Sequence, residues 1–387
     1  MPLPLVALFI TACAIGTTEF VVSGLLPQVS IDLGVDIPTA GLLVSGYAMG
    51  VVIGGPIMTV LTARLSRRTA LLALVAIFIG ANVFCALSTS FAATLAARVM
   101  SAFAHGAFFG IATVVATGLV ADGRRASAIA LIGAGVMTAN ILGVPGGTAL
   151  GQALGWRATF WAISIAGVIA IAAMVLWLPA SGGGKSMDLP AEIRTLGRRS
   201  VLIGLLMLFL HGVGLFGLFT FIAPLLTTVS GFASAELPLL LLLFGIGAIA
   251  GTVLSGRLAD WRMDLSIVIV LVAQVLTYIL FGFLTGSAGA MYALMILLGI
   301  VGMAAPAPLR ALVLEAARDA PSLAATFCSS AFNLGVAVGA TMGSVAISSG
   351  ASYAQLPWIG VTCSIAGLAI FALTRRTRRV RPVPDTP

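Results

Sequence analysis

Apolar runs, separated by short breaks that hold charges, glycine or proline, recur along the whole sequence. A helix needs about 20 apolar residues to cross the hydrocarbon core of a bilayer. The runs are this long, so they predict an all-α membrane protein with twelve transmembrane helices. The predicted spans are 3–26, 38–61, 69–88, 91–120, 127–150, 157–178, 200–227, 236–258, 265–286, 288–313, 322–348 and 354–373.

Composition excludes the other broad classes. Of the 387 residues, 60% are hydrophobic and only 8% are charged. A soluble domain carries about 25% charged residues, so this chain cannot cover a water-facing surface. A soluble enzyme, a secreted module and a disordered protein are therefore excluded.

The net charge of +8 is explained by topology. All twenty Lys and Arg residues except Arg98 and Arg157 follow even-numbered spans, and Arg310 is counted with the turn after the tenth. Basic loops stay on the cytoplasmic side of a membrane. We therefore expect a multi-pass protein of a bacterial-type inner membrane with both termini cytoplasmic, and no nucleic-acid partner.

A hydrophilic stretch interrupts the chain near its middle, where Ser, Gly and Lys follow the sixth span. Such a composition is typical of a flexible linker. We expect an N-terminal six-helix half at 1–180, a cytoplasmic linker at 181–199, a C-terminal half at 200–373 and a basic cytoplasmic tail at 374–387.

The two halves look like repeats of one another. A shift of 197 residues places Pro27 on Pro224, Gly50 on Gly247 and Gly54 on Gly251. Parallel repeats of this kind are related by an axis along the membrane normal, and the binding site lies near the midplane between them. The same shift pairs Glu19 with Phe216, which places the acid in the first half only.

Three motifs support a family assignment. The first motif, at the loop after the second span, includes Gly54, Arg64 and Arg67. The second is a Gly/Pro run in the fifth span, with Gly143, Pro145 and Gly147. The third is the sequence Gly-Thr-Thr-Glu-Phe in the first span. Together they resemble the major facilitator superfamily, in particular its twelve-span drug:proton antiporter branch and the chloramphenicol and sugar exporters within it. The resemblance implies two six-helix halves around a central cavity.

Glu19 and Arg98 are the candidates for proton coupling. Ionisable groups inside a span are costly and are functional candidates by default. Each lies about eight residues from the outer end of its span, or about 12 Å deep, so the two share a level. Arg98 either pairs with Glu19 or binds span-one backbone carbonyls, and both residues also have a purely structural interpretation. His105 lies two turns beyond Arg98, as a relay or as packing.

Six further side chains are candidates for substrate contact. Asn140 and Asn333 are amides inside spans, and such groups must face the bundle interior. The aromatic candidates have packing against neighbours or lipid as their alternative interpretation. The six residues are Phe20, Tyr47, Asn140, Phe216, Phe219 and Asn333.

Charged residues at the cytoplasmic ends are candidates for a gate. Arg64 or Arg67 would pair with Asp122 at the end of the fourth span and lock an outward-open state. Asp260 would hold its own loop together. The alternative for the arginines is that they set topology alone.

The sequence therefore favours a proton-coupled antiporter that exports small amphipathic compounds. It is expected to act as a monomer, with the proton gradient in place of any cofactor or metal. A sugar or nucleoside exporter, an uptake symporter and a non-transporting membrane sensor remain as alternatives. No GxxxxGK[ST] phosphate loop is present, which counts against an ATP-driven pump.

Overall fold

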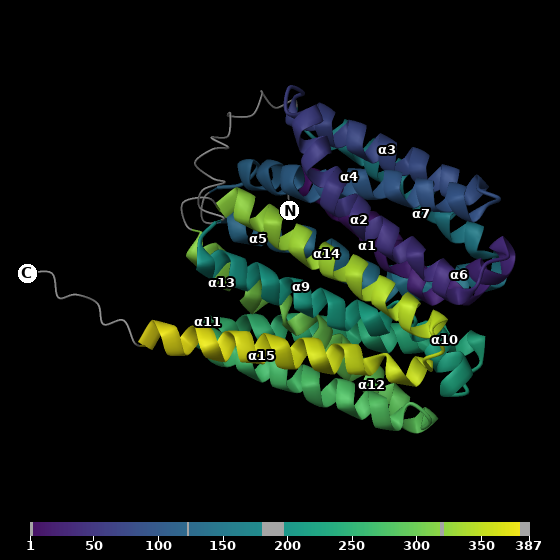
Figure 1. The fold of residues 1–387 in the computed structure, drawn as a ribbon. Helices are drawn as coiled ribbons and strands as arrows, with labels where there is room; N and C mark the ends of the chain where they lie inside the picture. The colour runs from purple at the N-terminus through teal and green to yellow at the C-terminus, as the bar shows by residue number, and fades with distance from the viewer. Residues whose placement is uncertain (1–2, 122–123, 180–196, 318–320, 380–387) are drawn as a thin grey trace, which may run out of the picture.

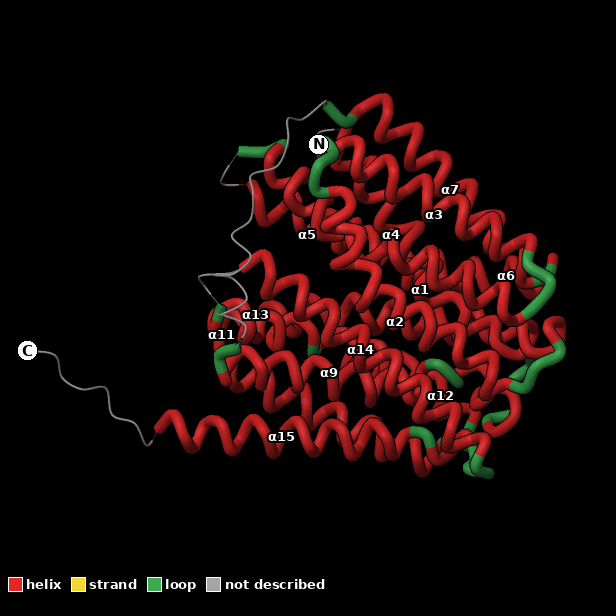
Figure 2. Tube along the Cα trace, turned by 45° about the horizontal axis from the view of Figure 1, so that its top comes forward, coloured by secondary structure: helices red, strands yellow, loops and turns green. Residues whose placement is uncertain are grey.

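The computed structural model describes residues 3–121, 124–179, 197–317 and 321–379, and within these ranges every regular element is helical (Figure 2). Eleven of the described helices are long and apolar enough to cross a membrane. One of these, Ser234–Leu284, joins two predicted spans across a kink at Arg262, so the predicted positions of the spans are confirmed.

The first half runs from α1 to α7 and includes a π-helix, η2, within the fifth span. Its elements are α1 (Leu3–Leu33), α2 (Ile37–Thr62), α3 (Arg67–Leu87), α4 (Phe91–Gly118), α5 (Arg125–Thr138), η2 (Ala139–Gly143), α6 (Val144–Leu154) and α7 (Trp156–Trp177). Pro145 explains the π-helix, because it has no N–H to donate to the carbonyl one turn earlier.

The second half runs from α9 to α15. Its elements are α9 (Arg199–Phe219), α10 (Ile222–Pro224), the π-helix η3 (Leu225–Val229), η4 (Ser234–Glu236), α11 (Leu237–Leu284), α12 (Ala288–Ala304), α13 (Pro306–Ala316), α14 (Pro321–Ser348), η5 (Tyr353–Gln355) and α15 (Pro357–Arg379). The purple and blue helices of the first half lie above the teal to yellow helices of the second (Figure 1).

Local sequence sets the helix ends. Asp36 caps α2 by accepting a hydrogen bond from the Thr39 amide at 2.9 Å, and hydrogen bonds from Thr39 hold the pKa of the Asp36 carboxyl below its usual value. Ser66 and Ser90 cap α3 and α4 in the same way. Gly155, with a φ of 88°, makes the turn between α6 and α7. We call the end of the bundle where α2 ends and α3 begins the basic end, and the other end the opposite end.

The repeat is visible as matching contacts between helices. Gly50 packs against Val99, and their counterparts 197 residues later, Gly247 and Ile296, pack in the same way. Close packing of small residues lets membrane helices approach each other, so the repeat is built into both helix pairs.

The first and fifth spans repeat in a different register. Gly135 lies against Phe9, and the matching pair is Gly335 and Phe209, 200 residues later. The counterpart of Glu19 is therefore Phe219, and its assignment to Phe216 was wrong. The second half has three fewer residues between its first and second spans and three more between its fourth and fifth, so one offset cannot align both helix pairs.

Candidate functional site

Glu19 lies near the middle of α1 with a half-buried side chain between the fully buried Thr18 and the buried Phe20. Within the described part of the chain its carboxylate makes no hydrogen bond or ion pair, and the positive charges that act on it belong to Arg98 and Arg310. A mid-span acid that keeps exposed surface faces a water-accessible space rather than lipid.

Arg98 fixes the backbone beside Glu19. Its side chain is buried, at 1% exposure, and its Nη1 donates a 2.6 Å hydrogen bond to the Thr18 carbonyl. Its guanidinium carbon lies 4.1 Å from the centre of the Tyr47 ring. Of the two arrangements left open by the sequence, the structure therefore has Arg98 on the backbone of α1, with the Glu19 carboxylate left free.

A polar network continues from this contact into α3. The Thr18 hydroxyl donates to Asn82 Oδ1 at 2.9 Å, and Asn82 Nδ2 donates to the Phe78 carbonyl at 2.7 Å. A buried polar group that loses its hydrogen-bond partner costs free energy. Sliding α1 along α3 would break these hydrogen bonds, so the network holds the two helices in one register. Nothing in the sequence distinguishes Asn82 from the other amides within the spans.

His105, which lies two turns after Arg98 in α4, pairs with Tyr47 of α2. The Tyr47 hydroxyl and His105 Nδ1 lie 2.9 Å apart, and both side chains are buried. The Phe109 ring meets the His105 ring edge-on at 5.2 Å. The structure therefore places the predicted relay residue and a predicted substrate residue in one buried cluster beside Arg98.

An aromatic layer joins the two halves at the level of Glu19. Phe20 of α1 stacks on Phe216 of α9 at 5.8 Å, and Phe216 meets Phe219 at 5.8 Å. Phe219 continues to Phe244 at 4.5 Å, and Phe216 to Phe332 at 6.0 Å. Three predicted substrate residues are thus brought together, and Phe244 and Phe332 join them without a signal in the sequence.

The two predicted asparagines lie in different surroundings. Asn140 is buried in η2, and its Nδ2 donates to Val136 O of its own helix at 3.1 Å. Gly245 of α11 packs directly against the Asn140 backbone, so this residue lies at the contact between the halves. Asn333 is buried in α14 and donates to Ser329 O, while its Oδ1 has no partner among the described residues.

The two halves are held together toward the opposite end. The Thr341 hydroxyl of α14 donates to Ser45 Oγ of α2 at 3.0 Å, and Ser344 donates to the Pro38 carbonyl. Gln152 Nε2 donates to the Ser234 carbonyl at 2.6 Å. These contacts join α2 to α14 and α6 to η4 across the two halves.

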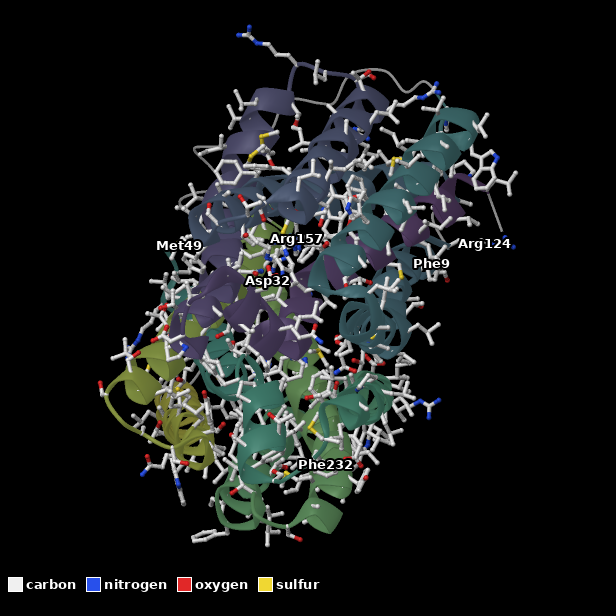
Figure 3. The ribbon with its side chains drawn as sticks, turned by 90° about the vertical axis from the view of Figure 1, so that its right-hand side faces the viewer. Phe9, Asp32, Met49, Arg124, Arg157 and Phe232 are labelled. Atoms are coloured by element: carbon white, nitrogen blue, oxygen red, sulfur yellow. The ribbon has the colours of Figure 1, made fainter. Side chains whose placement is uncertain are left out.

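Arg157 lies at the same opposite end, apart from the other arginines. It pairs with Asp32 at 2.5 Å, and the two side chains point toward each other in Figure 3. Its Nη2 also donates to the Ser88 carbonyl at 2.8 Å. Arg157 therefore fastens the start of α7 to α1 and α3 within the first half.

The sequence profile of the Major Facilitator Superfamily matches residues 8–340. The chain belongs to this superfamily. Its members are transporters and not enzymes, and the chain is accordingly a multi-pass secondary transporter for a small molecule.

Curated relatives match this superfamily member over nearly its whole length. It is 36% identical to the inner membrane transport protein YdhP of Escherichia coli (strain K12), over 97% of this chain and 96% of the relative. It is 34% identical to a chloramphenicol resistance protein of Streptomyces lividans, over 88% of each.

A solved structure confirms the superfamily fold. The crystal structure of a bacterial homologue of the human lysosomal transporter Spinster, in an inward-facing and unoccupied conformation, superposes with a TM-score of 0.76 and 18% identity over 98% of each chain. At that identity the likeness supports the fold alone.

The superfamily motif residues have mainly packing contacts. Gly54 lies against Phe103 of α4, Gly143 against Thr17 and Gly147 against Val21, while Pro145 is the second residue of α6. Arg64 is exposed and Arg67 begins α3, and their predicted partner Asp122 lies outside the described residues. Asp260 lies within α11, two residues before its kink, where a loop was expected.

Arg310 is the site residue that sequence reasoning missed. From the sequence it was expected with the turn after the tenth span, but α13 continues to Ala316 and places it six residues before the end of the helix. Its side chain is exposed, and its positive charge would favour the ionised form of Glu19 in the other half of this transporter. The only signal in the sequence was the number of residues between Arg310 and the next polar segment of the chain.

Proposed function

We propose that the protein is a proton-coupled antiporter that exports small amphipathic compounds by alternating access. The observation that carries the proposal is the Glu19 carboxylate. It is unpaired among the described residues and keeps some exposed surface, beside a backbone fixed by Arg98. A carboxyl group placed in this way can bind and release a proton without breaking an ion pair.

The aromatic layer supports a substrate with apolar surface. Phe20 follows Glu19 directly in α1, its ring stacks on Phe216, and Phe216 contacts Phe219. Ligand sites of this kind are mostly apolar, with a few polar groups that fix orientation. A sugar or nucleoside would need more hydrogen-bonding side chains than this layer offers, so an amphipathic compound fits better.

In the proposed cycle the basic end faces the cytoplasm, and this structure is the inward-open state. Substrate binds when Glu19 is ionised, and a proton taken up from the outer side displaces it. One proton moved by one pH unit and 100 mV supplies about 3.7 kcal/mol, which supports a gradient of roughly 500-fold for an uncharged substrate.

The test is Glu19→Gln in everted membrane vesicles. We expect proton-driven accumulation of chloramphenicol, chosen because a relative is a chloramphenicol resistance protein, to fall to the level of empty vesicles. Glu236→Gln makes the same acid-to-amide change at the opposite end and is expected to leave accumulation unchanged. Accumulation at the wild-type rate by Glu19→Gln would overturn the coupling assignment.

A further inference from the structure

The ring of Phe221 lies between the two halves at the opposite end of the bundle. Phe221 is placed between α9 and α10, and its side chain is fully buried. A Cβ added at Gly41 of α2 would lie 2.7 Å from Phe221 Cζ and 2.9 Å from Cε1. A Cβ added at Gly343 of α14 would lie 2.7 Å from Phe221 Cε2 and 3.0 Å from Cδ2. One edge of the ring therefore faces each glycine, and we call the space between Gly41 and Gly343 the glycine notch.

The two walls of the glycine notch belong to different halves. Gly41 lies four residues after the start of α2, in the first half, or about 6 Å along the helix axis. Gly343 lies five residues before the end of α14, in the second half, or about 8 Å along the axis. Phe221 belongs to the second half. Separation of the halves at this end therefore removes Gly41 from the ring and leaves Gly343 beside it.

The backbone at Phe221 departs from a regular helix. Its φ of −105° and ψ of 21° mark the break between α9 and α10. The Phe221 amide donates to the Leu218 carbonyl at 3.1 Å, three residues back rather than four. The break therefore places the ring, instead of the regular helical repeat of α9.

Further contacts surround the ring in the closed arrangement. The Tyr353 ring lies 6.4 Å from the Phe221 ring. Ser344, which follows Gly343 in α14, donates a hydrogen bond to the Pro38 carbonyl of α2. The contact of α2 with α14 and the contact of α2 with the ring are therefore made at the same place and must break together.

We propose that Phe221 is the outer gate residue of this transporter. With its ring in the glycine notch the outer end stays closed, and withdrawal of Gly41 from the ring opens it. The proposal rests on the proposed function, which places the opposite end outside the cell. It concerns a step of the cycle other than proton or substrate binding.

Only part of the packing around Phe221 can bias the gate. A contact shifts an equilibrium between two states only if it differs between them. The ring touches Gly41 in the closed state alone, and closure also removes apolar ring surface from water. Its contact with Gly343 lies within one half and persists in both states. Equal clashes at the two glycines therefore have different consequences.

The experiment measures how fast a membrane-impermeant maleimide labels Ser45→Cys in right-side-out membrane vesicles without substrate or a proton gradient. The four native cysteines are replaced in the full chain. Ser45 is 9% exposed and is hydrogen-bonded to Thr341 of α14, so its labelling rate follows the fraction of molecules with an open outer end.

We expect Gly41→Ala to raise the labelling rate at least fivefold, because opening relieves its clash with the ring. Gly343→Ala is the matched control. The three atoms nearest to its added Cβ, two of Phe221 and the Gly217 carbonyl oxygen, all belong to the second half. We expect it to lower the melting temperature and to change the labelling rate less than twofold.

Removing the ring tests the contact from the other side. We expect Phe221→Ala to raise the labelling rate at least fivefold. Gly41→Ala should add no further increase to Phe221→Ala, because the other atom near its added Cβ, Ser344 Oγ, lies at an ordinary contact distance of 3.4 Å. Such non-additivity is the signature of a direct contact.

A wild-type labelling rate of Phe221→Ala would overturn the proposal. Equal increases by Gly41→Ala and Gly343→Ala would also overturn it, because general loosening would then be the cause. If Gly41→Ala does not accumulate in the membrane, Phe221→Ala still decides. Labelling needs neither substrate nor coupling, so failure of the proposed function in the Glu19→Gln test leaves this test intact.

Discussion

Arg98 shows how a single side chain determines the geometry around Glu19. Its planar guanidinium donates to Thr18 O at 2.6 Å while lying over the Tyr47 ring at 4.1 Å. A lysine keeps the charge but offers neither the flat stacking surface nor the fixed donors. The role of Arg98 is therefore one of shape as much as of charge.

We expect Arg98→Lys to lower the transport rate by tenfold to a hundredfold. A buried hydrogen bond from a charged group contributes about 1.5–3 kcal/mol, and each 1.4 kcal/mol is a factor of ten. Transport in everted vesicles, normalised to the amount of protein in the membrane, is the measurement. Wild-type transport by Arg98→Lys would show that the charge alone is enough. Loss of the protein from the membrane would indicate a structural role.

Glu19 and Arg98 could be predicted from the sequence because charged residues inside a span are rare. Arg310 could not, because a predicted span boundary is uncertain by several residues and a charge near it resembles a topology signal. The partners of Asn82 and Arg98 also needed the structure. Which carbonyl or amide a buried polar group meets depends on how four helices are rotated against one another.

At the scale of elements, apolar run length predicted the positions of the spans but missed several of their ends. Helix α1 continues through Pro27 to Leu33, because a proline in a transmembrane helix is tolerated when neighbouring groups satisfy the freed carbonyl. The π-helix η2 was also missed, since a proline is compatible with a kink, a bulge or a helix start.

Close contact between α11 and η2 can be tested at one glycine. A Cβ added at Gly245 would lie 2.5 Å from the Asn140 carbonyl oxygen, and neither backbone can move easily. We expect Gly245→Ala to lower transport several-fold, because it separates the halves at this contact. The measurements are transport in vesicles and the melting temperature in detergent.

Gly256→Ala is the matched control in the same helix. A Cβ at Gly256 meets nothing within 4 Å, and replacing glycine with alanine in a helix stabilises it by up to about 1 kcal/mol. We expect wild-type transport and an equal or higher melting temperature. If Gly245→Ala behaves like Gly256→Ala, close approach of the halves at η2 is not needed.

For the whole molecule, the repeat predicted two similar halves and a site between them, but not how the halves meet. Inter-half pairs such as Ser45–Thr341 and Gly24–Leu241 join residues more than 200 positions apart. Nothing in local periodicity encodes such contacts. They depend on which state of an alternating-access cycle the molecule occupies, and one sequence must support at least two such states.

Alternating access requires the contact between α2 and α14 at the opposite end to open during each cycle. The Ser45 and Thr341 hydroxyl oxygens lie 3.0 Å apart across this contact, so cysteines at the two positions are close enough to be joined. We expect Ser45→Cys with Thr341→Cys, in a chain without its four native cysteines, to lose transport on oxidation and regain it on reduction. Each single cysteine variant should transport under both conditions. A cross-linked protein, verified by mass spectrometry, that transports at the uncross-linked rate would show that the halves need not separate here, and the proposed cycle would be wrong.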